Sequence, residues 1–435
     1  MKTLRTLGLI FVVAVVAACG GADKAAGPPN TLQRGISSDP ETLDQHKSRS
    51  IQAADVIRDL GEGLVGYSAT GELIPAAAES WEISEDGLKY TFHLRDGLRW
   101  SNGEALTASH FVAGMRRLVD PSTAAFYAEM LGDLENAAAI TSGDIPVSML
   151  GVEAPDERTV VLRLVQQTPY LISLMTHPST FPIHPGSIAE HGDSFARPGK
   201  LVSNGAYRLE AWVPGSVISL RRNEHYWNNA GTAIDAVNYH VIVQDSAELN
   251  RYRAGELHTT STVPPDSFAQ VREEHGEQLH VAPYLGVYYY GYNLTRPPFK
   301  DNAPLRQALS MAIDREQLAL RVTGRGEAPA YSWVPQGVNN YEPPLSSFAA
   351  LSKDEREQVA RRLYKEAGYS AENPLKIEVR YNTNDTNKKI AVAIQSMWSE
   401  VLGVEATLIN EEFQVLLANM RDAEITQVFR SSWMG

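Results

Sequence analysis

Two segments of the chain alternate between apolar and polar residues, as strands with one buried face do. Residues 81–100 alternate on both sides of Asp86-Gly87, a pair that strongly favours a tight turn. Residues 205–222 alternate in the same way around Pro214-Gly215. Each of these segments is therefore predicted to form a β-hairpin.

The rest of the chain changes repeatedly between the periods of helices and strands. The expected helices span residues 53–63, 108–119, 247–254, 304–323, 353–367, 388–402 and 413–420. The expected strands span residues 31–36, 160–164, 237–243, 288–293, 375–381, 404–409 and 427–430. Because helices and strands alternate throughout, we expect an α/β or mixed α+β fold divided into several lobes.

Length and charge limit the classes of protein that need to be considered. A chain of 435 residues is too long for one hydrophobic core, so two or three lobes are expected. A formal net charge of −13 argues against a nucleic-acid partner, which would need a basic face. After residue 19 no apolar run is long enough to span a membrane.

The N-terminal segment has the pattern of a secretory signal. Lys2 and Arg5 precede an apolar stretch over residues 7–18, and Cys19 follows a run of small residues. The segment is similar to a bacterial lipobox, which implies a signal peptide over residues 1–18, lipidation of Cys19 and a tether over residues 19–29. The protein would then sit in the periplasm or on the outer face of the cell membrane. An ordinary signal peptide with an incidental cysteine is the alternative.

Motifs of catalysis and cofactor binding are missing from the sequence. The eleven His residues are scattered and form no H-E-x-x-H pattern, and the single cysteine forms no metal-binding pair. The chain also lacks a nucleophile elbow and a phosphate-binding loop. We therefore expect no metal, no cofactor and no enzymatic activity, although the absence of motifs does not exclude an enzyme.

Five long segments resemble one family, the oligopeptide-binding proteins of peptide ABC importers. They occur in the family's order and include the W-S-x-G-x-x-x-T-A turn that begins at Trp100. The matching segments are residues 59–112, 201–230, 250–260, 298–319 and 381–413. The resemblance covers nearly everything from Leu32 to Trp433.

The resemblance implies a three-lobe, two-hinge periplasmic binding protein fold. Lobe one would combine residues 30–61 with residues 187–286, lobe two would span residues 62–186, and lobe three would start at residue 287. Such proteins close around their ligand and deliver it to membrane permease and ATPase subunits. The implied partners are therefore short peptides, an ABC importer and, through Cys19, a membrane, with the protein itself a monomer.

The resemblance also implies that an extended ligand lies between residues 49–51 and residues 431–434. Arg430 and Arg421 match positions whose guanidinium groups meet the ligand carboxylate, and the planar fork of arginine suits a carboxylate. The other implied contacts are Arg49, Ile51, Tyr127, Asn387, Phe413, Ser432, Trp433 and Met434. Asn387 stands where close relatives carry a histidine, which leaves the preferred ligand length open.

Several of these residues also have a purely structural interpretation. The alternatives are a helix-end cation for Arg421, a structural ion pair for Arg430, core packing for Tyr127 and Phe413, and hinge packing for Trp433. The family also continues beyond the position of Gly435, where an aspartate anchors the ligand's ammonium group. We therefore expect an incomplete third lobe and, from a chain that ends here, weak binding or none.

The most direct functional interpretation is an extracytoplasmic, lipid-anchored receptor that captures short peptides for an ABC importer. Within the same class, the ligand could instead be a murein peptide, a dipeptide or a non-peptide compound. An extracytoplasmic hydrolase on the same scaffold is a different class, and it would require a reactive group of residues in the cleft. A truncated form without transport function is the fourth possibility.

Overall fold

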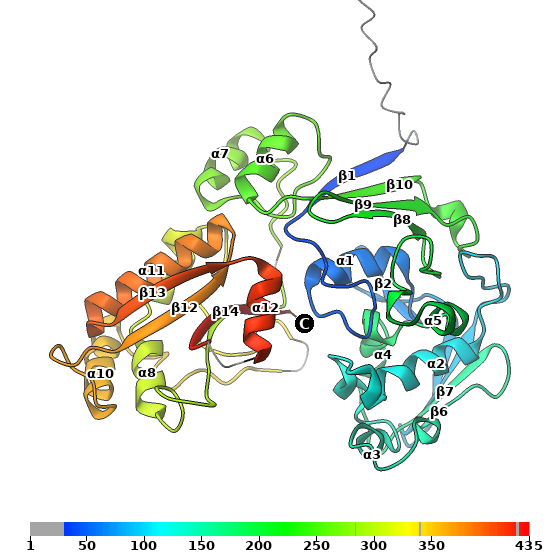
Figure 1. Cartoon of the computed structure of the whole chain (residues 1–435), viewed down its shortest axis with the longest axis horizontal. Helices are drawn as coiled ribbons and strands as arrows, with labels where there is room; N and C mark the ends of the chain where they lie inside the picture. Colours follow the sequence, from blue (N-terminus) through cyan, green and yellow to red (C-terminus); the bar gives the residue numbers. More distant parts are fainter. Residues whose placement is uncertain (1–29, 283, 339–340, 423–425, 435) are drawn as a thin grey trace, which may run out of the picture.

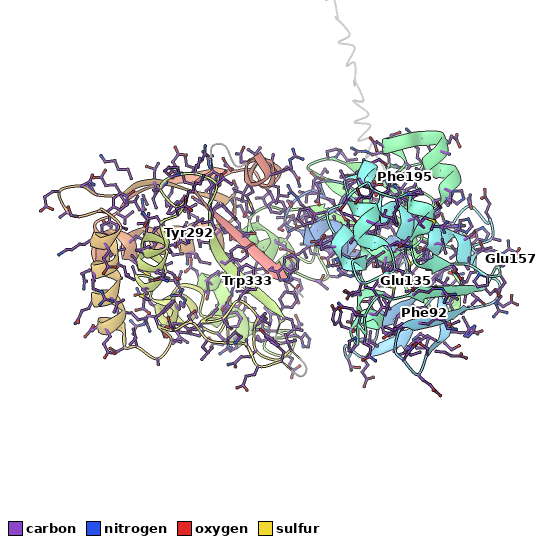
Figure 2. The ribbon with its side chains drawn as sticks, turned by 90° about the horizontal axis from the view of Figure 1, so that it is seen from below. Phe92, Glu135, Glu157, Phe195, Tyr292 and Trp333 are labelled. Carbon is purple, nitrogen blue, oxygen red and sulfur yellow. The ribbon has the colours of Figure 1, made fainter. Side chains whose placement is uncertain are left out.

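The computed structural model describes residues 30–282, 284–338, 341–422 and 426–434. The predicted signal peptide, the tether and the lipidation site at Cys19 lie outside these residues. The described chain contains three four-stranded sheets, each covered by helices (Figure 1). Figure 2 shows the third sheet with Tyr292 and Trp333 in one half of the molecule, and Phe92 and Phe195 in the other half.

The first sheet joins distant parts of the chain. Its strand order is β1-β10-β9-β8, and β1 runs parallel to β10 although about 200 residues separate them. Its strands are β1 (Thr31–Ile36), β8 (Tyr207–Val213), β9 (Val217–Arg222) and β10 (Ala236–Val241). Helix α1 (Ile51–Leu60) packs its buried Val56 and Leu60 against this sheet, where Leu220 and Tyr239 are also buried. Helices α5 (Pro185–His191), α6 (Asp245–Arg253) and α7 (Phe268–Glu274) complete this part.

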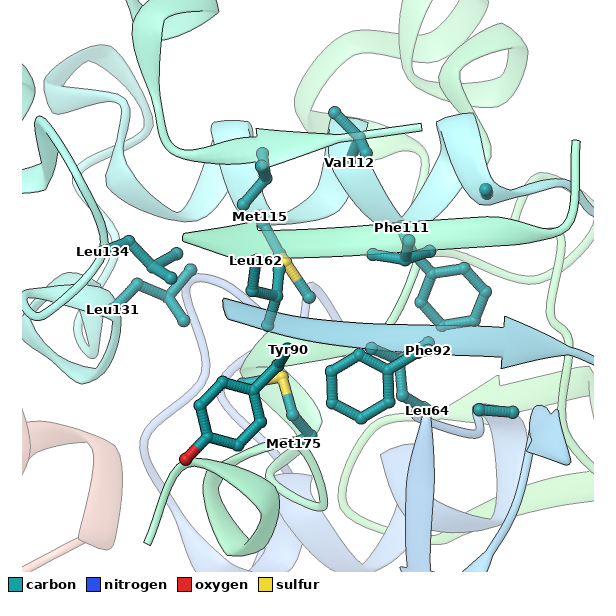
Figure 3. Packing of buried hydrophobic residues seen from close by; sticks show 14 of the residues in the cluster. Leu64, Tyr90, Phe92, Phe111, Val112, Met115, Leu131, Leu134, Leu162 and Met175 are labelled. Carbon is teal, nitrogen blue, oxygen red and sulfur yellow. The ribbon is translucent and has the colours of Figure 1, made fainter. Parts of the chain in front are cut away.

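The second sheet contains one of the predicted hairpins and a large apolar core. Its strands are β4 (Ala78–Ile83), β5 (Lys89–Leu94), β7 (Thr159–Arg163) and β6 (Val152–Glu153), all antiparallel in that order. Helix α2 (Ala108–Val119) covers one face, and Figure 3 shows Phe111 and Met115 packed over Phe92 and Leu162. The short elements β2 (Val65–Tyr67), β3 (Leu73–Pro75), α3 (Ala137–Thr141) and α4 (Leu171–Leu174) surround it.

The third sheet places the last described strand in its middle. Its order is β11-β14-β12-β13, with β11 (Gly286–Tyr292), β12 (Lys376–Asn382), β13 (Glu405–Glu411) and β14 (Val428–Met434). Helices α10 (Lys353–Glu366), α11 (Asp385–Leu402) and α12 (Phe413–Asp422) accompany it. The fully buried Trp398 donates a hydrogen bond from Nε1 to the Leu309 carbonyl at 2.9 Å, which ties α11 to helix α8 (Ala303–Met311).

The sequence prediction of one helix over residues 304–323 is wrong. The structure divides this segment into α8 (Ala303–Met311), α9 (Arg315–Gln317) and a turn of π-helix over Leu318–Thr323. The carboxylate of Asp314 accepts a hydrogen bond from the Gln317 N–H at 2.9 Å and so caps a new helix. Arg315 donates to the Ser310 carbonyl at 2.9 Å, which adds a side-chain partner to one of the last carbonyls of the first helix.

Two regions of hydrogen-bonded contact, here called joints, connect the three sheets. Arg117 on α2 donates to both oxygens of Asp44, at 2.8 and 2.7 Å, and to Nδ1 of His46 at 2.7 Å. At the second joint, Asp245 at the start of α6 accepts hydrogen bonds from Asn384 at 2.8 Å and Thr386 at 3.0 Å. Both joints are polar and hydrogen-bonded, while the cores on either side of them are apolar. Among the residues that the structure describes, no helix is long and apolar enough to cross a membrane.

Candidate ligand-binding site

Strand β14 has one edge that is only partly used. Along β11 it pairs over its whole length, from Val428 opposite Tyr292 to Met434 opposite Gly286. On the other side it pairs with β12 only at Val428 and Phe429. Within the described chain, no strand pairs with this side of residues 430–434. The backbone groups along this edge are therefore available to an added extended segment.

The two faces of β14 carry different chemistry because side chains alternate along a strand. On one face, Trp433 lies with its ring centroid 6.4 Å from that of Tyr127, and Tyr127 lies 4.9 Å from the ring of His177. Burial raises the pKa of the Tyr127 hydroxyl, as do Glu41 and Glu129, so this hydroxyl stays protonated. Trp433 keeps 45% of its surface exposed. The structure thus brings Tyr127 and Trp433 together, 306 residues apart in the sequence.

The other face of β14 carries a cation with uncharged partners. Arg430 donates to Oδ1 of Asn382 at 3.1 Å, and its guanidinium lies 4.7 Å from the centre of the Tyr288 ring. Within the described residues, no carboxylate forms a salt bridge with Arg430, and its Nε is buried without a hydrogen-bond partner. The alternative of a structural ion pair for Arg430 is therefore not what the structure shows. A partly buried cation of this kind favours an anionic ligand.

Asn387 lies behind this arginine and not at the surface of the site. It is only 5% exposed, in the first turn of α11. Its Nδ2 donates to the carbonyl of Asn382 at 3.3 Å and to Oδ1 of Asn382 at 3.0 Å. Its Oδ1 accepts from the Tyr288 hydroxyl at 3.1 Å. The amide that was expected to contact the ligand is thus engaged by neighbouring side chains.

The segment before α1 is fixed by one carboxylate. Glu41 accepts hydrogen bonds from the backbone N–H groups of Arg49 and Ser50 and from the Ser50 hydroxyl. Ser50 in turn caps α1 by accepting from the Ala53 N–H at 3.1 Å, and Ile51 begins the helix with a partly exposed side chain. Glu41 thereby holds this segment in one conformation.

Arg49 and Arg421 lie close enough for their charges to repel. Burial lowers the pKa of the Arg49 guanidinium, and Arg421 lowers it further, while Glu41 and Tyr127 oppose this shift. Arg421 is exposed in the last turn of α12. Neither guanidinium forms a salt bridge with a carboxylate in the described parts of the chain. The structure therefore places two further cations of the predicted site near one another.

The remaining predicted residues are Phe413, Ser432 and Met434, which lie on α12 and β14. Phe413 begins α12 and is partly buried, and the next residue, Gln414, donates to the Asp39 carbonyl at 3.1 Å. Ser432 pairs with Tyr288 across β11, and the sulfur of Met434 accepts from the Tyr284 hydroxyl at 2.8 Å. No group of three or more metal-ligating side chains gathers among the described residues.

Sequence reasoning missed the residues that support the site. Asn382 and Tyr288 surround Arg430, and Glu41 fixes the segment around Arg49. The aromatic run in strand β11 was a signal for a strand, but it gave no indication that Tyr288 would face an arginine on β14. Such contacts depend on the pairing of β11 with β14, and no local pattern specifies that pairing.

The comparison with protein families identifies the class. The family model described as "Bacterial extracellular solute-binding proteins, family 5 Middle" matches residues 72–435. The chain therefore belongs to this family of extracellular solute-binding proteins, whose members are binding proteins. This result confirms the family that the five sequence segments indicated.

Individual relatives match nearly the whole chain. The periplasmic oligopeptide-binding protein OppA of Escherichia coli (strain K12) is 37% identical over 439 residues, which cover 99% of this chain and 80% of the relative. A probable deoxycholate-binding periplasmic protein, YgiS of the same strain, is 38% identical over 99% of this chain and 81% of its own length. Relatives at this identity thus differ in the ligands that their names give.

Solved structures confirm the mixed α/β binding-protein fold. The murein tripeptide-binding protein MppA of Escherichia coli matches with a TM-score of 0.91 at 35% identity, over 93% of this chain and 79% of that structure. OppA of Haemophilus influenzae in complex with the peptide RPPGFSPFR matches with a TM-score of 0.89 at 36% identity. The match covers 93% of this chain and 80% of that structure. The unliganded open form of MppA, at 35% identity, matches over 93% of this chain and 78% of that structure. Its TM-score is only 0.62. The described chain thus has the arrangement seen in the peptide complex.

Proposed function

We propose that the protein captures short peptides in extended form and delivers them to an ABC importer. The observation that carries this proposal is Arg430, a partly buried cation to which the described residues supply no acidic partner, beside the edge of β14 that no described strand pairs. A peptide added to this edge would satisfy backbone groups without regard to its sequence, each hydrogen bond contributing about 1 kcal/mol. Its terminal carboxylate would meet Arg430.

The three sheets correspond in this proposal to three lobes. Lobe one comprises residues 30–61 and 187–286, lobe two residues 62–186, and lobe three the chain from residue 287. Lobes one and two contribute Arg49, Ile51 and Tyr127 to the site, and lobe three contributes β14 and Arg421. Closing the lobes would therefore assemble the site, and the contact between Tyr127 and Trp433 supports this view.

The same proposal includes the export of the protein and its partners. A lipid anchor on Cys19 would hold the binding protein beside its permease and ATPase subunits at the membrane. A monomer suffices, because a single chain supplies both sides of the cleft. Mass spectrometry of the mature N-terminus would reveal a diacylated Cys19, and an unmodified N-terminus would remove the anchor from the proposal without affecting peptide capture.

The test compares peptides that differ only in their C-terminal group. Calorimetric titration with tri- to pentapeptide pools should show binding of the free acids and weaker binding of the C-terminal amides. Arg430→Met should weaken free-acid binding by about 1.5–3 kcal/mol, the range for hydrogen bonds to charged groups. Arg208→Met, at an exposed position on β8, is the matched control and should bind as the wild type does. Unchanged free-acid binding by Arg430→Met would overturn the proposal.

A second candidate ligand is a steroid acid such as deoxycholate. The 38% identity to a probable deoxycholate-binding protein favours it, and a single carboxylate would again meet Arg430. Titration with deoxycholate separates the two functions. Binding of deoxycholate together with no binding of any peptide pool would replace the peptide receptor by a steroid-acid receptor.

A further inference from the structure

The described neighbours of Arg430 are uncharged, whereas Arg380 and Arg356, two buried arginines in the same part of the molecule, have acidic partners. Arg380, two residues before Asn382 on β12, forms salt bridges with Glu378 and Glu411. Arg356 on α10, which is 5% exposed, pairs with Glu316 at 3.2 Å. Arg430 instead has the amide of Asn382 and the ring of Tyr288. The site thus supplies hydrogen bonding to the guanidinium without cancelling its charge.

The amide of Asn382 is oriented by further contacts. Its Oδ1 accepts from both Arg430 at 3.1 Å and Nδ2 of Asn387 at 3.0 Å, so the oxygen points toward the two donors. Asn387 is held in turn by the Tyr288 hydroxyl, which donates to its Oδ1 at 3.1 Å. Burial raises the pKa of Tyr288, so the hydroxyl keeps the proton that it donates. The three side chains form one uncharged cluster around the cation.

We infer that Asn382 is the positioning residue that makes the site selective for ligands with a free carboxylate. Its neutral oxygen holds the guanidinium of Arg430 in place, and the positive charge stays available to the ligand. Asn387 and Tyr288 keep that oxygen turned toward the arginine. This inference rests on the proposed function, because it concerns how Arg430 selects the ligand that it binds.

An aspartate at this position would have nearly the same shape but the opposite effect. Asn382→Asp would place a carboxylate oxygen at the position of Oδ1, and an internal ion pair with Arg430 would replace the ligand's own. Binding of free-acid peptides should fall by at least about tenfold, because the ligand would lose a charge-assisted contact. Binding of the matching C-terminal amides should change much less, so the preference for free acids should nearly disappear.

The matched control adds the same charge elsewhere on the sheet. Asn410 on the neighbouring strand β13 is exposed and accepts a hydrogen bond from Thr383 at 2.7 Å. Asn410→Asp therefore adds one negative charge to this sheet without a contact to Arg430. The Asn410→Asp variant should prefer free acids as strongly as the wild type does. This result would separate the effect of a local ion pair from the effect of an added negative charge.

A second variant covers the case in which Asn382→Asp does not fold. Asn382→Ala removes the hydrogen bond but adds no charge, so free-acid binding should fall by about fivefold while amide binding changes little, and the preference for free acids should shrink without disappearing. Thermal unfolding of each variant establishes that it is folded. Unchanged affinity in Asn382→Ala would contradict the positioning role.

Peptide capture through Arg430 and the positioning role of Asn382 are overturned by different results. If the wild type binds free acids and amides equally well, Arg430 does not meet a carboxylate and the proposed function loses its main support. If the wild type prefers free acids and the folded Asn382→Asp variant retains that preference, only the inference about Asn382 is overturned.

Discussion

Arg117 and Arg430 are both partly buried cations, but the two regions around them have opposite designs. Arg117 lies at the joint between the first and second sheets, with 15% of its side chain exposed, and binds both oxygens of Asp44, which is 4% exposed. Arg430 lies beside the unpaired edge of β14, with an amide and an aromatic ring as its partners. Among the described residues, a carboxylate compensates the first charge and none compensates the second.

The difference separates a structural arginine from one suited to binding. At the joint, burial alone would raise the pKa of the Asp44 carboxyl, but hydrogen bonds and charge from Arg117 hold that pKa below its usual value. The ion pair between Arg117 and Asp44 therefore forms within the folded protein, without a ligand. At β14, the described residues supply no such carboxylate, and in the proposed function the ligand supplies it. The chemistry of the neighbours, and not burial, distinguishes the two roles.

The largest expected effect comes from breaking the joint. Asp44→Asn leaves Arg117 partly buried without a carboxylate, and such losses typically cost about 3–5 kcal/mol of unfolding free energy. Arg430→Met removes a cation that has no acidic partner among the described residues, and should change stability by less than about 1 kcal/mol. Urea unfolding of both variants measures the contrast. Equal destabilisation by the two substitutions would show that Arg430 is also a structural residue.

The second effect is a dependence of stability on pH that originates at the same joint. Burial, and next the charge of Arg117, lower the pKa of His46 to about 3, while Asp44 opposes the shift. The unfolded chain, with a histidine pKa of about 6.5, binds the proton more readily. The free energy of unfolding should therefore fall as the pH decreases from about 6.5 toward 3, by up to about 1.4 kcal/mol per pH unit.

His46→Gln isolates the contribution of this histidine. The variant should lose less stability between pH 6.5 and 4.5 than the wild type does, whatever its stability at neutral pH. Other buried histidines, such as His177 with a pKa lowered to about 4, keep their share of the slope. Urea unfolding at several pH values gives both slopes, and identical slopes would remove the joint as the source of the effect.

The smallest expected effect concerns the exposed face of β14. Trp433→Ala removes a ring that is 45% exposed and lies 6.4 Å from Tyr127. Because the aromatic contact is worth about 0.5–1.5 kcal/mol, peptide affinity should fall by about fivefold with little loss of stability. Tyr170→Ala, at an exposed aromatic residue beside α4, serves as the control. Equal affinity in wild type and Trp433→Ala would leave Trp433 outside the site.

Local sequence patterns predicted most elements of the fold. The hairpin around Asp86-Gly87 forms from β4 and β5, with Gly87 at φ +69°, a left-handed conformation that favours glycine. The helix predicted over residues 388–402 ends at Leu402 as expected, and the following Gly403 has φ +72°. The same helix begins three residues earlier than predicted, because Asn384 accepts from the N–H groups of Thr386 and Asn387.

The arrangement of the site was less accessible from the sequence. Matching to a family suggested Arg430 and Tyr127 as site residues, but the side chains that surround Arg430 come from β11, β12 and α11. Asn387 was assigned to the ligand because its position in the family suggested it. Only the spatial structure shows that its amide is engaged by Tyr288 and Asn382. Hydrogen bonds between distant segments leave no periodic signal in the sequence.

The incomplete pairing of β14 with β12 has a consequence for the register in which an extended ligand would bind. A strand docked along residues 430–434 would continue the pleat of the sheet, so its odd and even side chains would point to opposite faces. One set would enter the aromatic surroundings of Trp433 and Tyr127, and the other the polar surroundings of Arg430 and Asn382. Moving the ligand by one residue would exchange the two sets, so its register, as much as its composition, would decide how well it is held.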